Sequence, residues 1–282
     1  MTYLITGATG NIGGRVVDRL LAKDARPRVF ARDAEKARQR FGDPADVALG
    51  DLSDPASLER ALRGIEALFL VNAGPDLAAK DKAAAEAAKS AGVRLVVKLS
   101  TYDVAQQVGT GAWHAAGEAA IRASGLGFAF VQPSGFMDNF LHWATSIKSD
   151  GVVRSATAGG RIPFIHSDDI ADVAVACLTT PSLEGEALPI TGPEALSFGE
   201  MTEKVAAAIG RPLRFQPISD DEARRQHLAW GAPAPLVEAR LSIFRAIREG
   251  RLAEVTDHVE RVVGRKPLAF DQWAQQNAAA FV

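Results

Sequence analysis

Three evenly spaced glycines near the N-terminus constrain the fold of this chain more than any other feature. They lie in the run Thr6-Gly7-Ala8-Thr9-Gly10-Asn11-Ile12-Gly13, between a short apolar run and a segment with apolar residues at helical spacing. In a strand–turn–helix unit, the first glycine permits a tight turn, the second lets a ligand approach the backbone, and the third lets the helix pack closely. The dipole and N–H groups at such a helix start favour a pyrophosphate. The motif predicts a dinucleotide site formed by Gly7, Thr9, Gly10, Asn11, Ile12 and Gly13.

Short apolar runs alternate with helical segments over the first half of the chain. Strands are predicted at 3–6, 28–31, 47–49, 67–71, 93–99 and 128–132, with helices between them at 11–22, 34–41, 76–90 and 113–123. The strands show no polar–apolar alternation, as expected for a sheet covered on both faces. We therefore predict an α/β fold with a Rossmann-type doubly wound parallel sheet.

The alternation ends near Pro133, which suggests a change of organisation. Strands are still predicted at 161–165, 188–191 and 214–218, and a helix at 167–178, whereas 220–281 is mostly helical. We interpret 1–133 as an NAD(P)-binding core and 134–282 as a smaller α/β cap for the substrate. Within the cap, 161–192 is expected to return to the Rossmann sheet.

Composition disfavours several functional classes. The net charge of −2 and the scattered basic residues give no reason to expect a nucleic-acid partner. The single cysteine, Cys177, lies in an apolar-periodic run, which is typical of a core residue. No apolar run approaches the roughly 20 residues that cross a bilayer, and neither a signal peptide nor metal-ligand spacing is recognisable. We expect a cytoplasmic protein, a monomer or homodimer, without a metal or a membrane partner.

The residue after the second strand bears on which dinucleotide binds. Arg32 stands there, and a guanidinium can form charge-assisted bonds to a 2′-phosphate. This favours NADP(H) over NAD(H). The alternative is that Arg32 is a solvated residue at the end of a strand and has no role in binding. Asp33, which follows it, is expected to cap the next helix.

Other strand ends should contribute to the same rim, because ligands of such folds lie at the carboxyl ends of the strands. Asp51 could accept a hydrogen bond from the adenine amino group with Leu52 on the ring, or it could bind nearby backbone. The remaining rim residues include Asn72, Ala73, Ser100, Tyr102, Pro133 and Phe136.

These segments together resemble the NmrA-like group of atypical short-chain dehydrogenase/reductases, which includes NAD(P)H:quinone reductases and NADPH-sensing regulators. The resemblance covers nearly the whole chain and rests on 5–13, 50–52, 90–93, 97–100, 132–139, 164–171 and 190–194. It implies that Arg32 binds the 2′-phosphate and that Lys82 reaches the cofactor. It further implies an adenine site bordered by Asp51 and Leu52, and a nicotinamide site bordered by Asn72, Ala73, Pro133 and Phe136.

The chain departs from this family at the usual catalytic pair. Most short-chain reductases carry Tyr-x-x-x-Lys on the helix after the fifth strand, where this chain has His114 and Glu118. His114 could donate a proton with Glu118 orienting it, or it could simply line a pocket. Tyr102 and Lys98, near the end of the fifth strand, are the other candidates for proton donor and anchor.

The missing pair favours chemistry that needs little acid catalysis. Hydride transfer to a quinone, azo or nitro acceptor depends mainly on the cofactor and its orientation. We therefore predict an NAD(P)H-dependent oxidoreductase that reduces a small planar acceptor such as a quinone. The alternative is a non-catalytic NADP(H)-binding redox sensor; a sugar-nucleotide epimerase-like enzyme is a third interpretation, which the missing pair disfavours.

Overall fold

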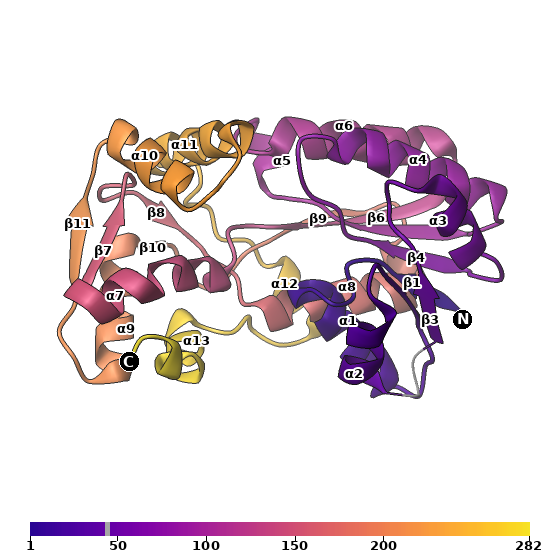
Figure 1. Cartoon of the computed structure of the whole chain (residues 1–282), viewed down its shortest axis with the longest axis horizontal. Coiled ribbons are helices and arrows are strands. Elements are labelled where there is room, and N and C mark those ends of the chain that lie inside the picture. The colour runs from indigo at the N-terminus through magenta and orange to yellow at the C-terminus, as the bar shows by residue number, and fades with distance from the viewer. Residues whose placement is uncertain (43–45) are drawn as a thin grey trace. The chain divides into compact units, whose positions relative to one another are not determined.

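A computed structural model describes residues 1–42 and 46–282 of the chain (Figure 1). The chain forms two compact units built from interleaved segments. The first unit comprises Met1–Thr101, Trp113–Gln132 and Ile170–Leu188, and the second comprises Tyr102–Ala112, Pro133–Asp169 and Pro189–Val282. The chain therefore passes between the units several times. The sequence predicted a core over 1–133 and a cap over 134–282, with a return to the Rossmann sheet within 161–192.

A seven-stranded sheet forms the centre of the first unit. Its strand order is β3-β2-β1-β4-β5-β6-β9, and the pairs from β3 through β6 are parallel. The strands are β1 (Tyr3–Ile5), β2 (Arg28–Ala31), β3 (Asp46–Leu49), β4 (Ala67–Leu70), β5 (Leu95–Leu99), β6 (Gly127–Pro133) and β9 (Ala187–Ile190). The central β1 lies between β2 and β4, so the chain winds outward in both directions. This confirms the predicted doubly wound Rossmann-type fold.

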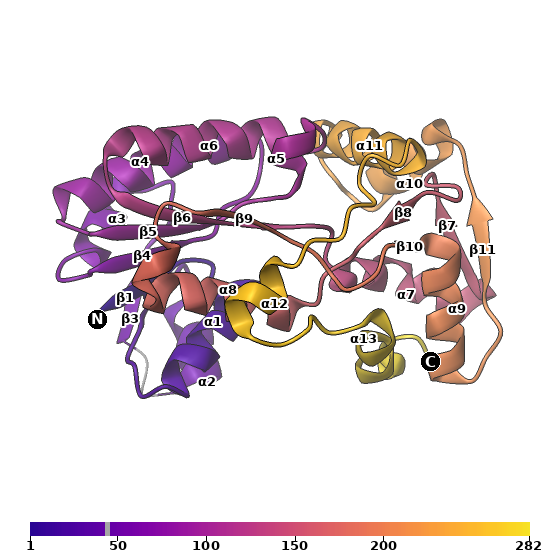
Figure 2. The same cartoon turned by 180° about the vertical axis from the view of Figure 1, so that it is seen from behind.

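Helices cover both faces of this sheet. Figures 1 and 2 show α3 (Pro55–Ala61), α4 (Leu77–Ser90) and α6 (Gly111–Ser124) on one face, with α1 (Asn11–Leu21), α2 (Ala34–Phe41) and α8 (Ser167–Thr179) on the other. The first face buries one apolar cluster that joins the sheet to α3, α4 and α6 through residues such as Leu58, Ala84 and Ile121. Every residue of β4 and β5 is buried.

The second unit contains two small sheets and most of the C-terminal helices. β7 (Val152–Ser155) pairs in parallel with β11 (Arg214–Pro217), and β8 (Arg161–Ile162) pairs antiparallel with β10 (Leu196–Ser197). Its other elements are α5 (Asp103–Gln106), η1 (Met137–Trp143), α7 (Ala144–Asp150), α9 (Phe198–Ile209), α10 (Asp220–Ala229), α11 (Ala234–Arg248), α12 (His258–Val263), α13 (Phe270–Gln276) and η3 (Ala278–Ala280). The short helix η2 (Pro181–Leu183) belongs to the first unit.

Aromatic side chains fill the core of the second unit around Phe140. Its ring centroid lies 5.6 Å from that of Trp143 and 6.2 Å from that of Trp273. Met137 and Phe198 are buried in the same cluster. These side chains form the apolar core of the second unit.

The strand predicted at 161–165 is shorter in the structure and does not join the large sheet. β8 ends at Ile162 because Pro163 has no N–H to continue a ladder, and its partner is β10. Within 161–192, β9 is the strand that pairs in the seven-stranded sheet. No helix in residues 1–42 or 46–282 is long and apolar enough to cross a membrane.

Candidate functional site

The glycine-rich turn after β1 is shaped by close backbone contacts. Gly7 has a φ of +60°, a conformation that L side chains rarely adopt. A Cβ on Gly13 would lie 2.3 Å from the carbonyl oxygen of Gly7 and 2.9 Å from the nitrogen of Ala8. Since both obstacles are backbone atoms, the turn can pack on the first turn of α1 only if residue 13 is glycine.

The start of α1 is suited to an anion. Gly10 is the N-cap and provides no side-chain hydrogen bond to the helix, and no acidic residue occupies the first turn. The N–H groups of a first helical turn have no partner within the helix, so an external acceptor is favoured there. Gly10 is exposed and Thr9 half-buried, whereas Ile12 and Gly13 are buried under them. These residues fit the pyrophosphate of a dinucleotide.

Arg32 and Asp51 come together at the ends of β2 and β3. The Arg32 side chain is 84% exposed, and its Nε lies 3.9 Å from Asp51 Oδ2. Asp51 Oδ1 accepts a hydrogen bond from the backbone N–H of Ser53 at 2.7 Å, which lowers the pKa of this carboxyl. Asp51 therefore binds nearby backbone, one of its two predicted roles. Leu52 is half-buried against the core, and Asp33 caps α2 through the N–H of Lys36, as predicted.

The turn after β4 is organised by Asn72. Its Nδ2 donates to Leu77 O at 3.3 Å and to Asp81 Oδ1 at 3.4 Å, and its Oδ1 accepts from the N–H of Ala73 at 2.9 Å. Ala73 is exposed, and so is Lys82, whose Nζ lies 3.9 Å from Glu86 Oε1. Both polar atoms of the Asn72 amide group, Oδ1 and Nδ2, therefore form hydrogen bonds.

The position of the usual catalytic pair is occupied by a different network. Glu118 is buried and accepts hydrogen bonds from Ser100 Oγ at 2.5 Å and Gln132 Nε2 at 2.8 Å. Among the described residues, His114 Nδ1 is buried and has no hydrogen-bond partner. Glu118 therefore binds the ends of β5 and β6, in place of the predicted contact with His114.

His114 is expected to remain neutral well below physiological pH. Burial, with a smaller contribution from the nearby Lys98 ammonium, lowers its pKa to about 3. In an NMR titration of the imidazole signals from pH 8 to pH 4, the His114 signal, assigned by its loss in His114→Gln, should not move. A His114 midpoint near 6.5 would contradict this assignment.

Lys98 is wholly buried in β5 and forms an ion pair with a residue that sequence reasoning missed. Its Nζ lies 2.6 Å from Asp81 Oδ2, and both side chains are 0% exposed. Asp81 lies on the buried face of α4 with Leu77, Ala84 and Ala88. The sequence held one sign of this pair, because Asp81 is an acidic residue on the apolar face of an Ala-rich helix.

The remaining candidates lie in the second unit. The Tyr102 hydroxyl donates to Glu254 Oε2 at 2.9 Å, and burial, followed by this bond, raises the pKa of Tyr102 to about 12. Pro133 ends β6 and is buried, and Phe136 is half-buried and forms a parallel bridge with Ile165.

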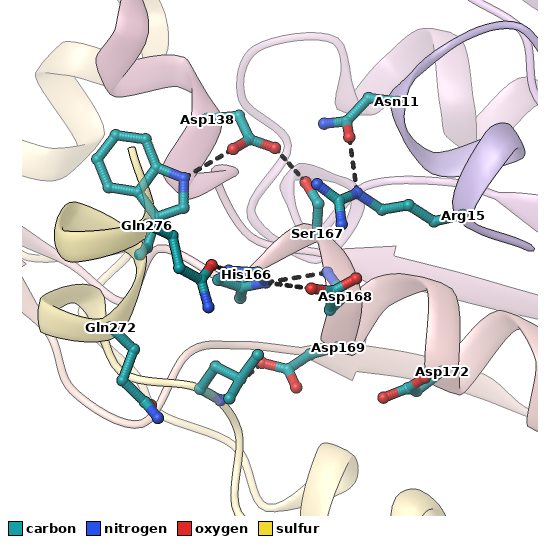
Figure 3. Close-up of polar contacts among 12 residues, drawn as sticks. Asn11, Arg15, Asp138, His166, Ser167, Asp168, Asp169, Asp172, Gln272 and Gln276 are labelled. Carbon is teal, nitrogen blue, oxygen red and sulfur yellow. Dashed lines mark hydrogen bonds and ion pairs between the residues drawn. The ribbon is translucent and has the colours of Figure 1, made fainter. Parts of the chain in front are cut away.

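The polar cluster at 166–169 also lies in the second unit and ties the C-terminal segment to the start of α8 (Figure 3). Asp138 accepts from Trp273 Nε1 at 2.7 Å and from Ser167 Oγ, while His166 Nε2 bonds to Gln276 Oε1 at 3.0 Å. Asp169 accepts from the N–H of Leu268 at 2.8 Å. In residues 1–42 and 46–282, no group of three or more His, Cys, Asp or Glu side chains is arranged to hold a metal ion.

Comparison with known proteins defines the family. Residues 7–181 match the family model described as NAD(P)H-binding. The chain is 39% identical to (4-alkanoyl-5-oxo-2,5-dihydrofuran-3-yl)methyl phosphate reductase of Streptomyces griseus subsp. griseus, over 99% of this chain and 98% of that protein. It is 36% identical, with the same coverage, to NAD(P)H azoreductase of Xenophilus azovorans. The chain belongs to the NAD(P)H-binding family.

Solved structures share the fold over nearly the whole chain. The NADPH-dependent quinone oxidoreductase of Escherichia coli, complexed with NADPH, has a TM-score of 0.89 at 21% identity and covers 98% of this chain and 99% of its own. A variant of NmrA has a TM-score of 0.79 at 16% identity, covering 98% and 94%. The named reductases among the sequence relatives support a catalytic oxidoreductase over a non-catalytic regulator.

Proposed function

We propose that this chain catalyses hydride transfer from NADPH to a small planar, conjugated acceptor such as a quinone or an azo compound. The observation that carries the proposal is the start of α1, where Gly10 leaves the helix without a side-chain cap and Gly13 closes the turn. When bound, NADPH supplies a hydride, which brings the acceptor two electrons and one proton. Water supplies the second proton of the reduced product.

The side chains near the end of β5 support an acceptor that needs no strong acid. A neutral, buried His114 is a poor proton source at pH 7, and the Tyr102 hydroxyl is bound to Glu254 with its pKa raised to about 12. A conjugated acceptor spreads the negative charge left by hydride transfer over several atoms. Such an acceptor therefore has less need of a positioned donor than an isolated ketone.

The names of two sequence relatives also support a conjugated acceptor. The Xenophilus protein is named for reduction of azo compounds, and the Streptomyces protein for reduction of an oxo-dihydrofuran phosphate. Both names describe conjugated acceptors, and both proteins align with 99% of this chain.

An acceptor panel tests the proposal. Purified protein should oxidise NADPH only when a simple quinone or an azo dye is present, and should be inactive with an isolated aliphatic ketone. Tight binding of NADPH without turnover on any acceptor would contradict the catalytic proposal. Faster turnover with the ketone than with the quinone would contradict the proposed acceptor class.

Selectivity for NADPH is proposed to depend on Arg32. Its exposed guanidinium lies at the end of β2, and among the residues that the structure describes its one ion-pair partner is Asp51, 3.9 Å away, so it can turn toward a 2′-phosphate. Arg32→Ala should weaken NADPH binding by about tenfold to a hundredfold and change NADH binding by less than about twofold. Fluorescence titration measures both, with the exposed Arg60→Ala on α3 as control. Equal weakening for the two cofactors would contradict the assignment.

We also propose that the protein is cytoplasmic and works as a monomer or homodimer. The compartment is supported by the buried, unpaired Cys177, which is compatible with a reducing environment. Light scattering of the purified protein tests the oligomeric state, and a larger assembly would contradict it.

A further inference from the structure

A fully buried ion pair lies in the first unit, and the proposed hydride transfer does not use it. Lys98 on β5 and Asp81 on α4 are both 0% exposed, with 2.6 Å between Nζ and Oδ2. Removing two charges from water is costly, and replacing a buried pair by apolar side chains is often neutral or stabilising. Stability alone therefore gives no reason for this pair.

The pair acts on the turn after β4 through the other carboxylate oxygen. Asp81 Oδ1 accepts from Asn72 Nδ2, which also donates to Leu77 O, while Asn72 Oδ1 accepts from the N–H of Ala73. An ionised carboxylate can only accept hydrogen bonds, so it fixes which end of the Asn72 amide faces it. One side chain thus spans the turn from the end of β4 to the first residue of α4.

The packing of α6 holds the carboxylate in this place. A Cβ on Gly117 would lie 2.2 Å from Asp81 Oδ2, so a side chain at 117 would displace the carboxylate. Burial raises the pKa of Asp81, and the Lys98 ammonium opposes that rise. Lys98 therefore favours the ionised, accepting form of Asp81.

We propose that Lys98 and Asp81 are positioning residues, which set the Asn72 turn and through it the place of the nicotinamide half of the cofactor. Lys98 holds Asp81 as a carboxylate, Asp81 orients the Asn72 amide, and Asn72 fixes residues 72–77 at the carboxyl end of β4. The inference rests on the proposed function, and it places the cofactor against this turn because ligands of such folds lie at the carboxyl ends of the parallel strands, where β4 ends.

A set of variants separates positioning from stability. Lys98→Met combined with Asp81→Leu removes both charges and keeps the space filled, so the temperature of unfolding should stay near that of the wild type. The same protein should bind NADPH about tenfold to a hundredfold more weakly, because the Asn72 amide has lost its charged partner. Adding Asn72→Ala to the pair should give no weaker binding than Asn72→Ala alone, since both act through one group. Glu86→Gln, an exposed acid on α4, is the charge control.

A measurement without cofactor gives an independent readout. Amide hydrogen exchange in 72–77 should be at least about tenfold faster in the double variant, while exchange in the centre of β5 stays unchanged. If the double variant does not fold, Asp81→Asn, which keeps the shape and loses the charge, should show the same faster exchange and weaker binding.

Wild-type affinity for NADPH together with wild-type exchange in the folded double variant would overturn the inference. A wild-type chain that binds no NADPH would overturn the proposed function instead. In that case the exchange data would still decide whether the pair orders the turn.

Discussion

Replacing Gly13 with alanine is expected to weaken NADPH binding at least about a hundredfold. The new Cβ would lie 2.3 Å from Gly7 O and 2.6 Å from Gly7 C, and neither backbone atom can yield without moving the turn. Moving the turn shifts the N–H groups at the start of α1, on which an anion depends. The dissociation constant from fluorescence titration, beside circular dichroism to establish folding, measures the effect.

The neighbouring glycine provides the matched control. A Cβ on Gly14 would come within 2.2 Å of the Arg40 guanidinium, the far end of a flexible side chain that can move aside. Gly14→Ala should therefore bind NADPH within about threefold of the wild type, since alanine suits a helix interior better than glycine. If both variants bound equally well, the role given to Gly13 would be wrong.

Lys98→Met alone is expected to lower the free energy of unfolding by about 3–5 kcal/mol at pH 7. The substitution leaves the Asp81 carboxylate buried without its cation, and both side chains are inaccessible to water. Urea denaturation followed by circular dichroism measures the change. Adding Asp81→Leu should restore most of the lost stability.

The loss should depend on pH in a defined direction. Burial raises the pKa of Asp81 and the Lys98 ammonium opposes that rise, so the pKa of Asp81 should be higher still in Lys98→Met. In Lys98→Met the deficit should therefore be small near pH 4 and grow as the pH rises through the raised pKa. Lys82→Met breaks an exposed ion pair with Glu86 on α4, the helix that carries Asp81, and should lower the free energy of unfolding by less than about 1 kcal/mol at either pH. A pH-independent loss in Lys98→Met would contradict the role of Asp81.

Local sequence signals were enough to predict β2 and the start of the helix that follows it. β2 spans Arg28–Ala31 as predicted, and Asp33 caps the following helix, because strand apolarity and capping chemistry are encoded within a few residues. The strand at 161–165 was wrong beyond Ile162, since Pro163 interrupts the backbone ladder and β10 provides the partner.

The buried polar network was beyond local reasoning. His114 and Glu118 are four residues apart on α6, which suggested a contact, but Ser100 and Gln132 from two strand ends take the carboxylate. Asp81 and Lys98 are paired by the packing of α4 on β5, and no spacing within either segment encodes that contact. Tertiary packing decided these partners.

Transfer of deuterium from NADPH labelled at one face of nicotinamide C4 tests the central claim most directly. Purified protein is mixed anaerobically with each of the two stereospecifically labelled forms and a quinone, and the oxidised cofactor is examined by mass spectrometry. The account predicts acceptor-dependent turnover with deuterium lost from one face only, because the chain holds the nicotinamide in one orientation. Absence of turnover, or equal loss from both faces, would contradict it.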